Sequence, residues 1–448
     1  MGLLEKLERQ RLNKQKDASQ EENKQVGRYI DIYSDLKEKV HQEVINTINK
    51  NNIVINNKDN SEEIRKVIED IIDIEAEDVS RAIRAKIADD LLNEVVGYGP
   101  LEVLLQDPSV SEIMVNGPHR VYIEKYGKLQ LSEVNFKDND HVLNVIDRIV
   151  TSVGRHIDEA SPMVDARLQD GSRVNAVIPP LSLVGPVITI RKFSKKPITA
   201  EQLLEYGSLS SKMVAFLDAC VKGKINIIVS GGTGSGKTTL LNVLSSFIPD
   251  NERIITIEDA AELQLVQDHV ITLESRPSNL EGKGQISIRE LVRNSLRMRP
   301  DRIIVGEVRS AETLDMLQAM NTGHDGSLTT IHANTPRDSI SRIETMVLMT
   351  GMELPLKAIR DQVTSAIDII IQQARLRDGT RKITNITEIN GMEGDTVIMQ
   401  DIFLYETDGQ MDSNSKFKGK FKGTGVRPRC LEKIRHNGVR VNDDWFQD

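Results

Sequence analysis

The sequence predicts an α/β protein in which a domain with a parallel sheet follows a helical bundle and an α+β domain. In the second half of the chain, short apolar runs alternate with segments of helical periodicity, the pattern of a parallel sheet flanked by helices. In residues 26–95, apolar positions recur at helical spacing instead. A length of 448 residues accommodates about two to four domains, in agreement with this division.

The first half of the chain predicts three parts in order. Residues 1–25 are charged and rich in Gln, Asn and Lys, so we expect a flexible arm there. Residues 26–95 carry three apolar stripes at helical spacing, which predicts a helical bundle with Ser61 as the cap of its second helix. Residues 96–197 predict an α+β domain. Its expected strands are 112–115, 121–125, 173–178 and 187–193, and its expected helix is 141–153.

A glycine-rich segment follows the polar stretch 198–207, which we expect to be a linker into the last domain, residues 208–448. The apolar run 225–229 is typical of a buried strand, and the pattern Gly-x-x-x-x-Gly-Lys-Thr comes directly after it. A strand, a glycine loop and a helix in this order form a phosphate cradle, because loop N–H groups turn inward and the helix N-terminus adds positive potential. We therefore expect nucleoside triphosphate binding by Gly232, Thr233, Gly234, Ser235, Gly236, Lys237, Thr238 and Thr239.

Three further apolar runs in this domain end in polar residues. They are 254–257, 303–305 and 327–331, and the residues that follow them are Glu258 with Asp259, Glu307, and His332. Because the carboxyl ends of parallel strands meet at one edge of a sheet, these side chains are expected to lie near the phosphates.

Phosphoryl-transfer chemistry suggests a role for each of these groups. Lys237 is expected to contact the β- and γ-phosphates, while Thr238, Glu258 and Asp259 are expected to hold Mg²⁺, the carboxylates often through water. Glu307 suits the base that orients the attacking water. His332 is expected to donate to the γ-phosphate, and a satisfied structural histidine is an equally good interpretation. An arginine on the phosphates is also expected. The candidates beside the Glu307 strand are Arg297, Arg299, Arg302 and Arg309.

Composition restricts the partners and the compartment. A net charge of −9, a pI near 5.6 and 4% aromatic residues argue against nucleic acid as the main partner. Only two cysteines, Cys220 and Cys430, are present, which excludes a disulfide framework and indicates the reducing cytoplasm. No signal peptide or long apolar span is visible, so any membrane contact is expected to be peripheral.

With these motifs, residues 90–448 resemble the traffic ATPases of type II secretion, type IV pili and type IV secretion, which are RecA-like hexameric motors. The most specific part is Arg-Pro-Asp-Arg-Ile-Ile-Val-Gly-Glu-Val-Arg over 299–309, followed by Thr-Ile-His-Ala-Asn over 330–334. Within this superfamily the chain is most similar to the CpaF group of Tad (Flp) pilus assembly ATPases, on the closing stretch 423–433 and the helical N-terminal extension. It departs from the family's pattern in lacking the tetracysteine zinc motif of many relatives.

The resemblance implies a homo-hexamer that hydrolyses ATP with Mg²⁺ in a RecA-like P-loop NTPase motor domain preceded by a PAS-like domain. Arginines of that preceding domain are then expected to approach the phosphates, at Arg173 and Arg191 in this chain, with Arg167 as a weaker candidate. The resemblance also implies a cytoplasmic protein, peripheral at the inner face of the cell membrane, that acts on an inner-membrane platform protein to power pilus assembly or secretion.

Three alternatives remain at this stage. The first is a conjugative type IV secretion traffic ATPase. The second is a nucleic-acid translocase, against which the acidic composition and the few aromatic residues count. The third is a nucleotide-gated scaffold with incidental hydrolysis, against which Lys237 and Glu307 count.

Overall fold

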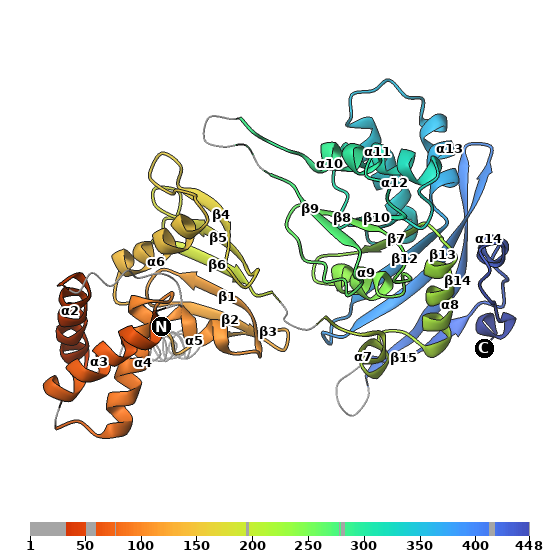
Figure 1. The fold of residues 1–448 in the computed structure, drawn as a ribbon. Helices are drawn as coiled ribbons and strands as arrows, with labels where there is room; N and C mark the ends of the chain where they lie inside the picture. Colours follow the sequence, from red (N-terminus) through yellow and green to blue (C-terminus); the bar gives the residue numbers. More distant parts are fainter. Residues whose placement is uncertain are drawn as a thin grey trace, which may run out of the picture. The chain divides into compact units, whose positions relative to one another are not determined.

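The computed structural model describes residues 33–50, 60–76, 78–193, 197–276, 278, 283–411 and 417–447. The arm expected at residues 1–25 lies outside the described residues. The chain divides into two compact units, Met1–Phe193 and Ser194–Asp448, and each is described by itself (Figure 1).

Three helices begin the described part of the first unit. They are α2 (Ser34–Lys50), α3 (Ser61–Glu75) and α4 (Arg81–Val95). Their apolar stripes share one core, in which Val40, Ile68 and Leu91 are at most 3% exposed. Asn60 rather than Ser61 is the N-cap of α3, because the carbonyl of Asn60 accepts the first hydrogen bond within the helix. Ser61 as the cap was therefore wrong by one residue.

A six-stranded antiparallel sheet follows in the first unit, in the order β3-β2-β1-β6-β5-β4. Its strands are β1 (Val110–Asn116), β2 (Val121–Lys125), β3 (Lys128–Leu131), β4 (Met163–Arg167), β5 (Arg173–Val177) and β6 (Val187–Arg191). Helix α6 (Asn139–Ser152) and the short α5 (Leu101–Gln106) pack with this sheet around a second core. The two edge strands were not predicted, because all four residues of β3 are exposed and β4 has no fully buried residue to mark an alternation.

The second unit is built on a nine-stranded sheet in the order β15-β14-β13-β12-β7-β11-β10-β8-β9. The strands are β7 (Ile227–Gly231), β8 (Ile254–Glu258), β9 (Val270–Glu274), β10 (Arg302–Val305), β11 (Leu328–Ile331), β12 (Ile369–Arg375), β13 (Arg381–Glu393), β14 (Thr396–Met411) and β15 (Phe417–Gly423). The pairs from β12 to β9 are parallel, and the pairs from β12 to β15 are antiparallel. The mixed α/β fold predicted from the sequence is thus confirmed.

Helices cover both faces of this sheet (Figure 1). One core contains α8 (Ser211–Lys222), α9 (Lys237–Ser245) and α14 (Cys430–His436), and the other contains α10 (Ile288–Ser295), α11 (Glu312–Asn321), α12 (Pro336–Leu348) and α13 (Leu356–Ala366). A short 3₁₀ helix, η1 (Asp443–Phe446), adds Phe446 to the first of these cores. The fully buried strands β7, β8, β10 and β11 lie between the two layers, as expected for parallel strands.

The stretch 198–207, expected to be a linker, contains helix α7 (Ala200–Glu205). Thr199 and Gln202 form a capping box at its N-terminus, and Ala200 and Leu203 are buried in the core of the second unit. This segment is therefore folded onto the second unit.

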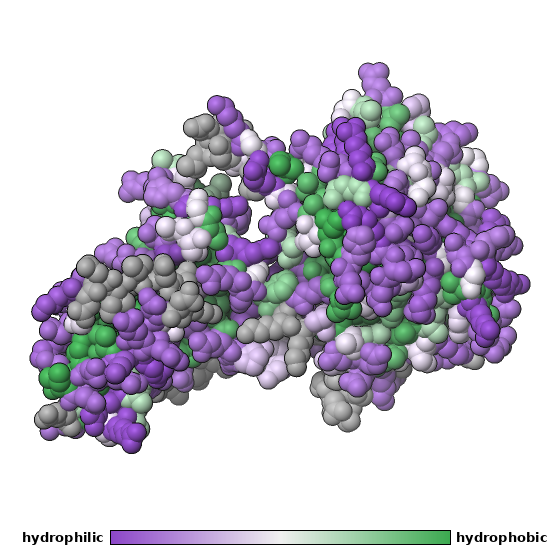
Figure 2. Space-filling view, in the orientation of Figure 1, coloured by the Kyte–Doolittle hydropathy of each residue, from purple (hydrophilic) through white to green (hydrophobic). Residues whose placement is uncertain are grey.

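Among the described residues, no helix is long and apolar enough to cross a membrane. Figure 2 shows that hydrophilic residues predominate on the visible face.

Candidate functional site

The glycine loop joins α9 to β7, the central strand of the nine-stranded sheet. Gly234 and Gly236 have φ angles of +69° and +99°, a region that favours glycine, and Gly236 is the N-cap of α9. Inside the loop, the Ser235 hydroxyl donates to the Gly232 carbonyl at 2.9 Å. The Lys237 ammonium donates to the same carbonyl at 3.1 Å. The loop is therefore folded back on itself at the N-terminus of α9, with Lys237 as the first helical residue.

Hydrogen bonds join the carboxyl ends of β8, β10 and β11 at the edge of the sheet that carries the glycine loop. The Gly306 N–H, just after β10, donates to the Ile257 carbonyl of β8 at 2.8 Å. On the other side, the Thr330 hydroxyl of β11 donates to the Gly306 carbonyl at 2.8 Å, and the Val308 N–H donates to the Thr330 carbonyl at 3.0 Å. The turn that carries Glu307 is thus held between two neighbouring strands.

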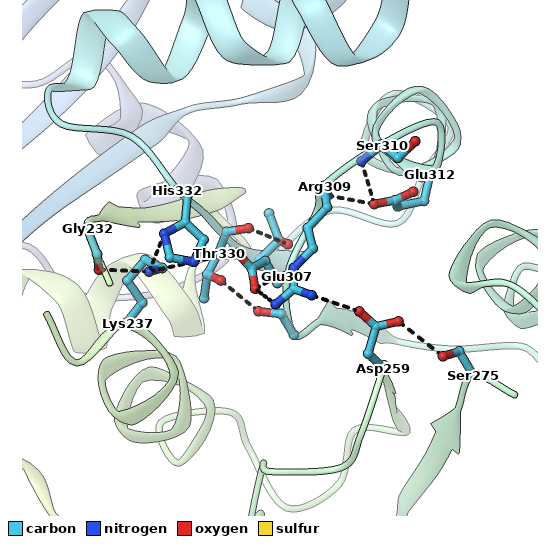
Figure 3. A network of polar contacts seen from close by, with 12 residues as sticks. Gly232, Lys237, Asp259, Ser275, Glu307, Arg309, Ser310, Glu312, Thr330 and His332 are labelled. Atoms are coloured by element: carbon cyan, nitrogen blue, oxygen red, sulfur yellow. Dashed lines mark hydrogen bonds and ion pairs between the residues drawn. The ribbon is translucent and has the colours of Figure 1, made fainter. Parts of the chain in front are cut away.

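Lys237, His332 and Glu307 form a chain of contacts across three strand ends (Figure 3). The Lys237 Nζ lies 3.3 Å from His332 Nδ1, and His332 Nε2 lies 2.9 Å from Glu307 Oε1. The Lys237 Nζ also lies 3.4 Å from His332 Nε2, so the ammonium faces both ring nitrogens. The imidazole therefore lies between the lysine and the glutamate.

Burial favours the uncharged forms of His332 and Lys237. Burial lowers the pKa of His332 below its ordinary value, while the Glu307 charge opposes this shift and Lys237 adds to it. Burial also lowers the pKa of Lys237, against the opposing charge of Glu307. Lys237 is only 8% exposed, and its charge is compensated across the imidazole by Glu307.

Arg309 forms hydrogen bonds with Glu307 on the side opposite to His332 (Figure 3). Its Nη2 and Nε lie 2.6 and 2.9 Å from Glu307 Oε2, and this hydrogen bonding raises the pKa of Arg309. Its Nη1 lies 3.4 Å from Asp259, which also accepts from Ser275 at 3.1 Å. The Glu312 carboxylate, at the start of α11, accepts the Arg309 N–H at 2.6 Å. Arg309 thus connects Glu307 with Asp259.

Glu258 is 4% exposed and lies against the Glu307 turn. Its Oε1 accepts the N–H groups of Glu262 and Leu263 at 2.9 and 3.2 Å. A Cβ on Gly306 would lie 2.8 Å from the Glu258 Cγ, so only glycine allows this close approach. The Glu258 carboxylate therefore shapes the segment after β8 as well as lying at the shared edge.

The residues expected to hold Mg²⁺ suit an ion that takes its other ligands from nucleotide phosphates and water. No group of three or more His, Cys, Asp or Glu side chains that could hold a metal occurs among the described residues. Magnesium commonly binds through one or two carboxylates, substrate phosphates and water, so a full protein cage is not required. Thr238 lies half-buried in the first turn of α9. Glu258 ends β8 at the same edge of the sheet, and Asp259 follows it.

The remaining arginine candidates divide between the two units. Arg302 starts β10 at the far end of that strand and is fully buried against Glu252. In the first unit, Arg173 pairs in register with Arg191 on one side and with Arg167 on the other. Arg191 also contacts Glu112 at 2.8 Å. The three strands thus align three arginines in one row across that sheet.

Two residues near the loop were not predicted. The Arg381 Nε of β13 donates to the Gly234 carbonyl at 3.0 Å, and Gln373 of β12 lies against Gly236. They stand more than 130 residues along the chain from the loop, and no local motif marks them.

The fold and the site define a class: an α/β protein whose glycine loop, lysine, glutamate and histidine meet at the carboxyl edge of a parallel sheet. The model of the family described as Type II/IV secretion system protein matches residues 94–424. The chain belongs to this family.

Known proteins with similar sequences include secretion and conjugation components. A putative conjugal transfer protein of Mycobacterium tuberculosis is 35% identical over 310 residues, which cover 68% of this chain and 88% of that protein. The type IV secretion system protein VirB11 of Bartonella quintana is 32% identical over 326 residues, which cover 64% and 90%. Among solved structures, the VirB11 ATPase of the Brucella suis type IV secretion system matches with 30% identity and a TM-score of 0.36, covering 64% of this chain and 94% of that one.

Proposed function

We propose that the chain is an ATP-hydrolysing motor for pilus assembly or secretion. The observation that carries the proposal is the chain of contacts from Lys237 through His332 to Glu307, beside a glycine loop at a helix N-terminus. A cradle of N–H groups and a lysine suits the β- and γ-phosphates, and a carboxylate on a fixed turn suits the activation of water. Membership of the secretion family supports the same function.

In this proposal Lys237 neutralises charge that develops on the phosphates. Glu307 orients the attacking water and takes its proton. His332 leaves Lys237 when a γ-phosphate arrives and donates to that phosphate. Mg²⁺, when bound, supplies charge stabilisation, and Thr238, Glu258 and Asp259 are the residues that would hold it, directly or through water.

The finer assignment extends the proposal to the whole protein. It is a CpaF-type homo-hexamer with a RecA-like motor domain, a PAS-like domain and an N-terminal helical bundle. It acts on an inner-membrane platform protein as a peripheral protein of the cytoplasmic face. Arg173 and Arg191 supply positive charge to the phosphates, and their pairing in register on β5 and β6 supports a joint role.

A conjugative type IV secretion ATPase is the second candidate. The similarity to a putative conjugal transfer protein and to VirB11 favours it. The two candidates share the chemistry and differ in the partner. Co-purification of the chain from its native membrane with a pilus platform protein, or instead with a conjugation apparatus, separates them.

The catalytic part of the proposal is tested by substituting Glu307→Gln, which keeps the shape of the side chain and removes the base. We expect the rate of phosphate release from ATP to fall by about 10²- to 10⁴-fold while ATP binding is retained. Glu353→Gln, at an exposed glutamate of the same unit, is the matched control and should leave the rate unchanged. Undiminished phosphate release by Glu307→Gln would remove Glu307 as the base.

A further inference from the structure

Strand β12 supports the glycine loop from the side away from His332. Gln373 pairs in register with Gly231, and the pairing of β12 with β13 shifts at the step from Gln372 to Gln373. A Cβ on Gly231 would lie 2.3 Å from the Gln373 carbonyl oxygen, and a Cβ on Gly236 would lie 3.2 Å from the Gln373 Nε2. Gln373 is 3% exposed. The loop glycines at both ends thus pack directly on this one residue.

Arg381, at the start of β13, holds the outer part of the loop. Its Nε donates to the Gly234 carbonyl at 3.0 Å, and its Cδ lies 3.2 Å from the Cβ position of Gly236. Arg375, which pairs with Arg381 in register, has its Nη1 3.6 Å from the Cβ position of Gly234. The β12–β13 hairpin therefore places two guanidinium groups against the same loop residue.

The turn of this hairpin is internally braced. The Leu376 N–H donates to the Thr380 carbonyl at 2.8 Å. The Asp378 carboxylate accepts a hydrogen bond from the hydroxyl of Thr380 at 2.7 Å and another from the N–H of Phe417, at the start of β15, at 2.8 Å. These hydrogen bonds lower the pKa of Asp378, against the raising effect of its burial. Arg381 therefore follows a turn that is held by several hydrogen bonds.

The consecutive buried residues Gln372 and Gln373 lower the stability of the fold, because their side-chain oxygens lack hydrogen bonds within the described part of the chain. The side-chain oxygens of Gln372 and Gln373 are buried and accept no hydrogen bond from the described residues. An unsatisfied buried acceptor is destabilising, so such groups call for a reason other than stability. The Gln372 Nε2 donates to the carbonyls of Ala333 and Asn334 at 3.2 and 3.1 Å, directly after His332. The pair thus contacts both segments that meet at Lys237.

We propose that Arg381 and Gln373 are positioning residues that hold the glycine loop in its phosphate-binding conformation. The inference rests on the proposed function. A loop whose N–H groups face an anion must turn its carbonyls away from it, and Arg381 fixes the Gly234 carbonyl in that direction. If the loop is already ordered before the nucleotide binds, binding loses less free energy to ordering it. Nucleotide affinity is therefore raised without any new contact to the nucleotide.

The Arg381 half is tested by calorimetric titration of the full chain with ADP in the presence of Mg²⁺. We expect Arg381→Ala to weaken ADP binding by about five- to tenfold, the scale of one ordinary hydrogen bond, with an unchanged melting temperature. In hydrolysis assays the same variant should raise the KM for ATP and leave kcat within about twofold, as expected for uniform binding. Arg381→Lys should restore part of the affinity, because lysine keeps the charge without the planar group.

The matched control is Arg377→Ala, at an exposed arginine of the same turn, which should bind ADP like the wild type. Equal ADP affinity in the Arg381 and Arg377 variants would overturn the role of Arg381 while leaving the proposed function intact. If the wild type binds no ADP or ATP, the proposed function itself falls, and the inference falls with it.

The Gln373 half is tested by Gln373→Met, which keeps an unbranched side chain of similar length and removes the unsatisfied oxygen. We expect an equal or higher melting temperature together with weaker ADP binding, a combination that a merely structural residue would not give. A lower melting temperature with unchanged ADP affinity would show that Gln373 only supports the fold.

Discussion

At the residue scale, the site is organised around a neutral histidine between two opposite charges. The Lys237 Nζ lies 3.3 and 3.4 Å from the two ring nitrogens of His332, and His332 Nε2 lies 2.9 Å from Glu307 Oε1. Protonating the ring would place a cation beside the Lys237 ammonium, and Arg309 adds further positive charge nearby. The neutral ring is therefore part of the arrangement that keeps Lys237 and Glu307 connected.

This protonation state gives a prediction for the pH dependence of hydrolysis. The pKa of His332 is lowered from 6.5, chiefly by burial, so the ring stays neutral from pH 8 down to about 6.5 and becomes charged only below that value. We expect kcat/KM to be nearly flat above about pH 6.5 and to fall only below that value. His332→Gln, whose amide can accept and donate without titrating, should lose this acidic decline. A decline above pH 7, or the same decline in the glutamine variant, would contradict the assignment.

The sequence predicted which residues gather at the edge, because parallel strands end on the same side whatever their side chains do. It did not predict the contacts among them. Arg309 was one of four arginines near the Glu307 strand, and only its position after the turn brings it to Glu307 and Asp259. Glu258 was expected as a metal ligand, and its contacts with two backbone N–H groups depend on the path of the chain after β8.

At the scale of elements, the opposite end of the sheet is fastened by a buried ion pair. Arg302, at the start of β10, is fully buried and pairs with Glu252, whose Oε1 lies 3.3 Å from the Arg302 Nη2. Its Nη1 also donates to the Gly326 carbonyl, before β11. The pair thus ties together the starts of three neighbouring segments, far along the strands from Glu307.

Breaking this pair should lower stability without touching the chemistry. Glu252→Ala leaves the Arg302 charge buried and uncompensated, which typically costs about 3–5 kcal/mol of unfolding free energy. Chemical denaturation of the purified variant measures this loss, with Asp250→Ala, at a neighbouring exposed acid, as the control. In the fraction that remains folded, the hydrolysis rate per molecule should match the wild type. A loss below about 1 kcal/mol would show that Arg302 is not held by this pair.

Strands and helices with a clear apolar pattern were predicted from the sequence. Those that form through pairing or packing with distant segments were missed. The buried strands β7, β8, β10 and β11 follow from their apolar runs. The strands β13 and β15 did not, because β15 alternates lysines with glycines and aromatic residues and forms by pairing with β14. Helix α7 was missed because its stretch is polar overall and is fixed by a capping box and two buried side chains.

At the scale of the whole molecule, the chain carries separate cores in its two units. The glycine loop, Glu307 and His332 all belong to the second unit, while Arg173 and Arg191 belong to the first. If all of them act on one nucleotide, hydrolysis depends on both units.

The most direct test is an experimental structure of the full-length Glu307→Gln variant with ATP and Mg²⁺. We expect the β- and γ-phosphates to lie in the glycine loop within hydrogen-bond distance of the Lys237 ammonium, with His332 turned from Lys237 to the γ-phosphate and a water beside residue 307. A nucleotide bound elsewhere, or phosphates beyond the reach of Lys237, would contradict the account.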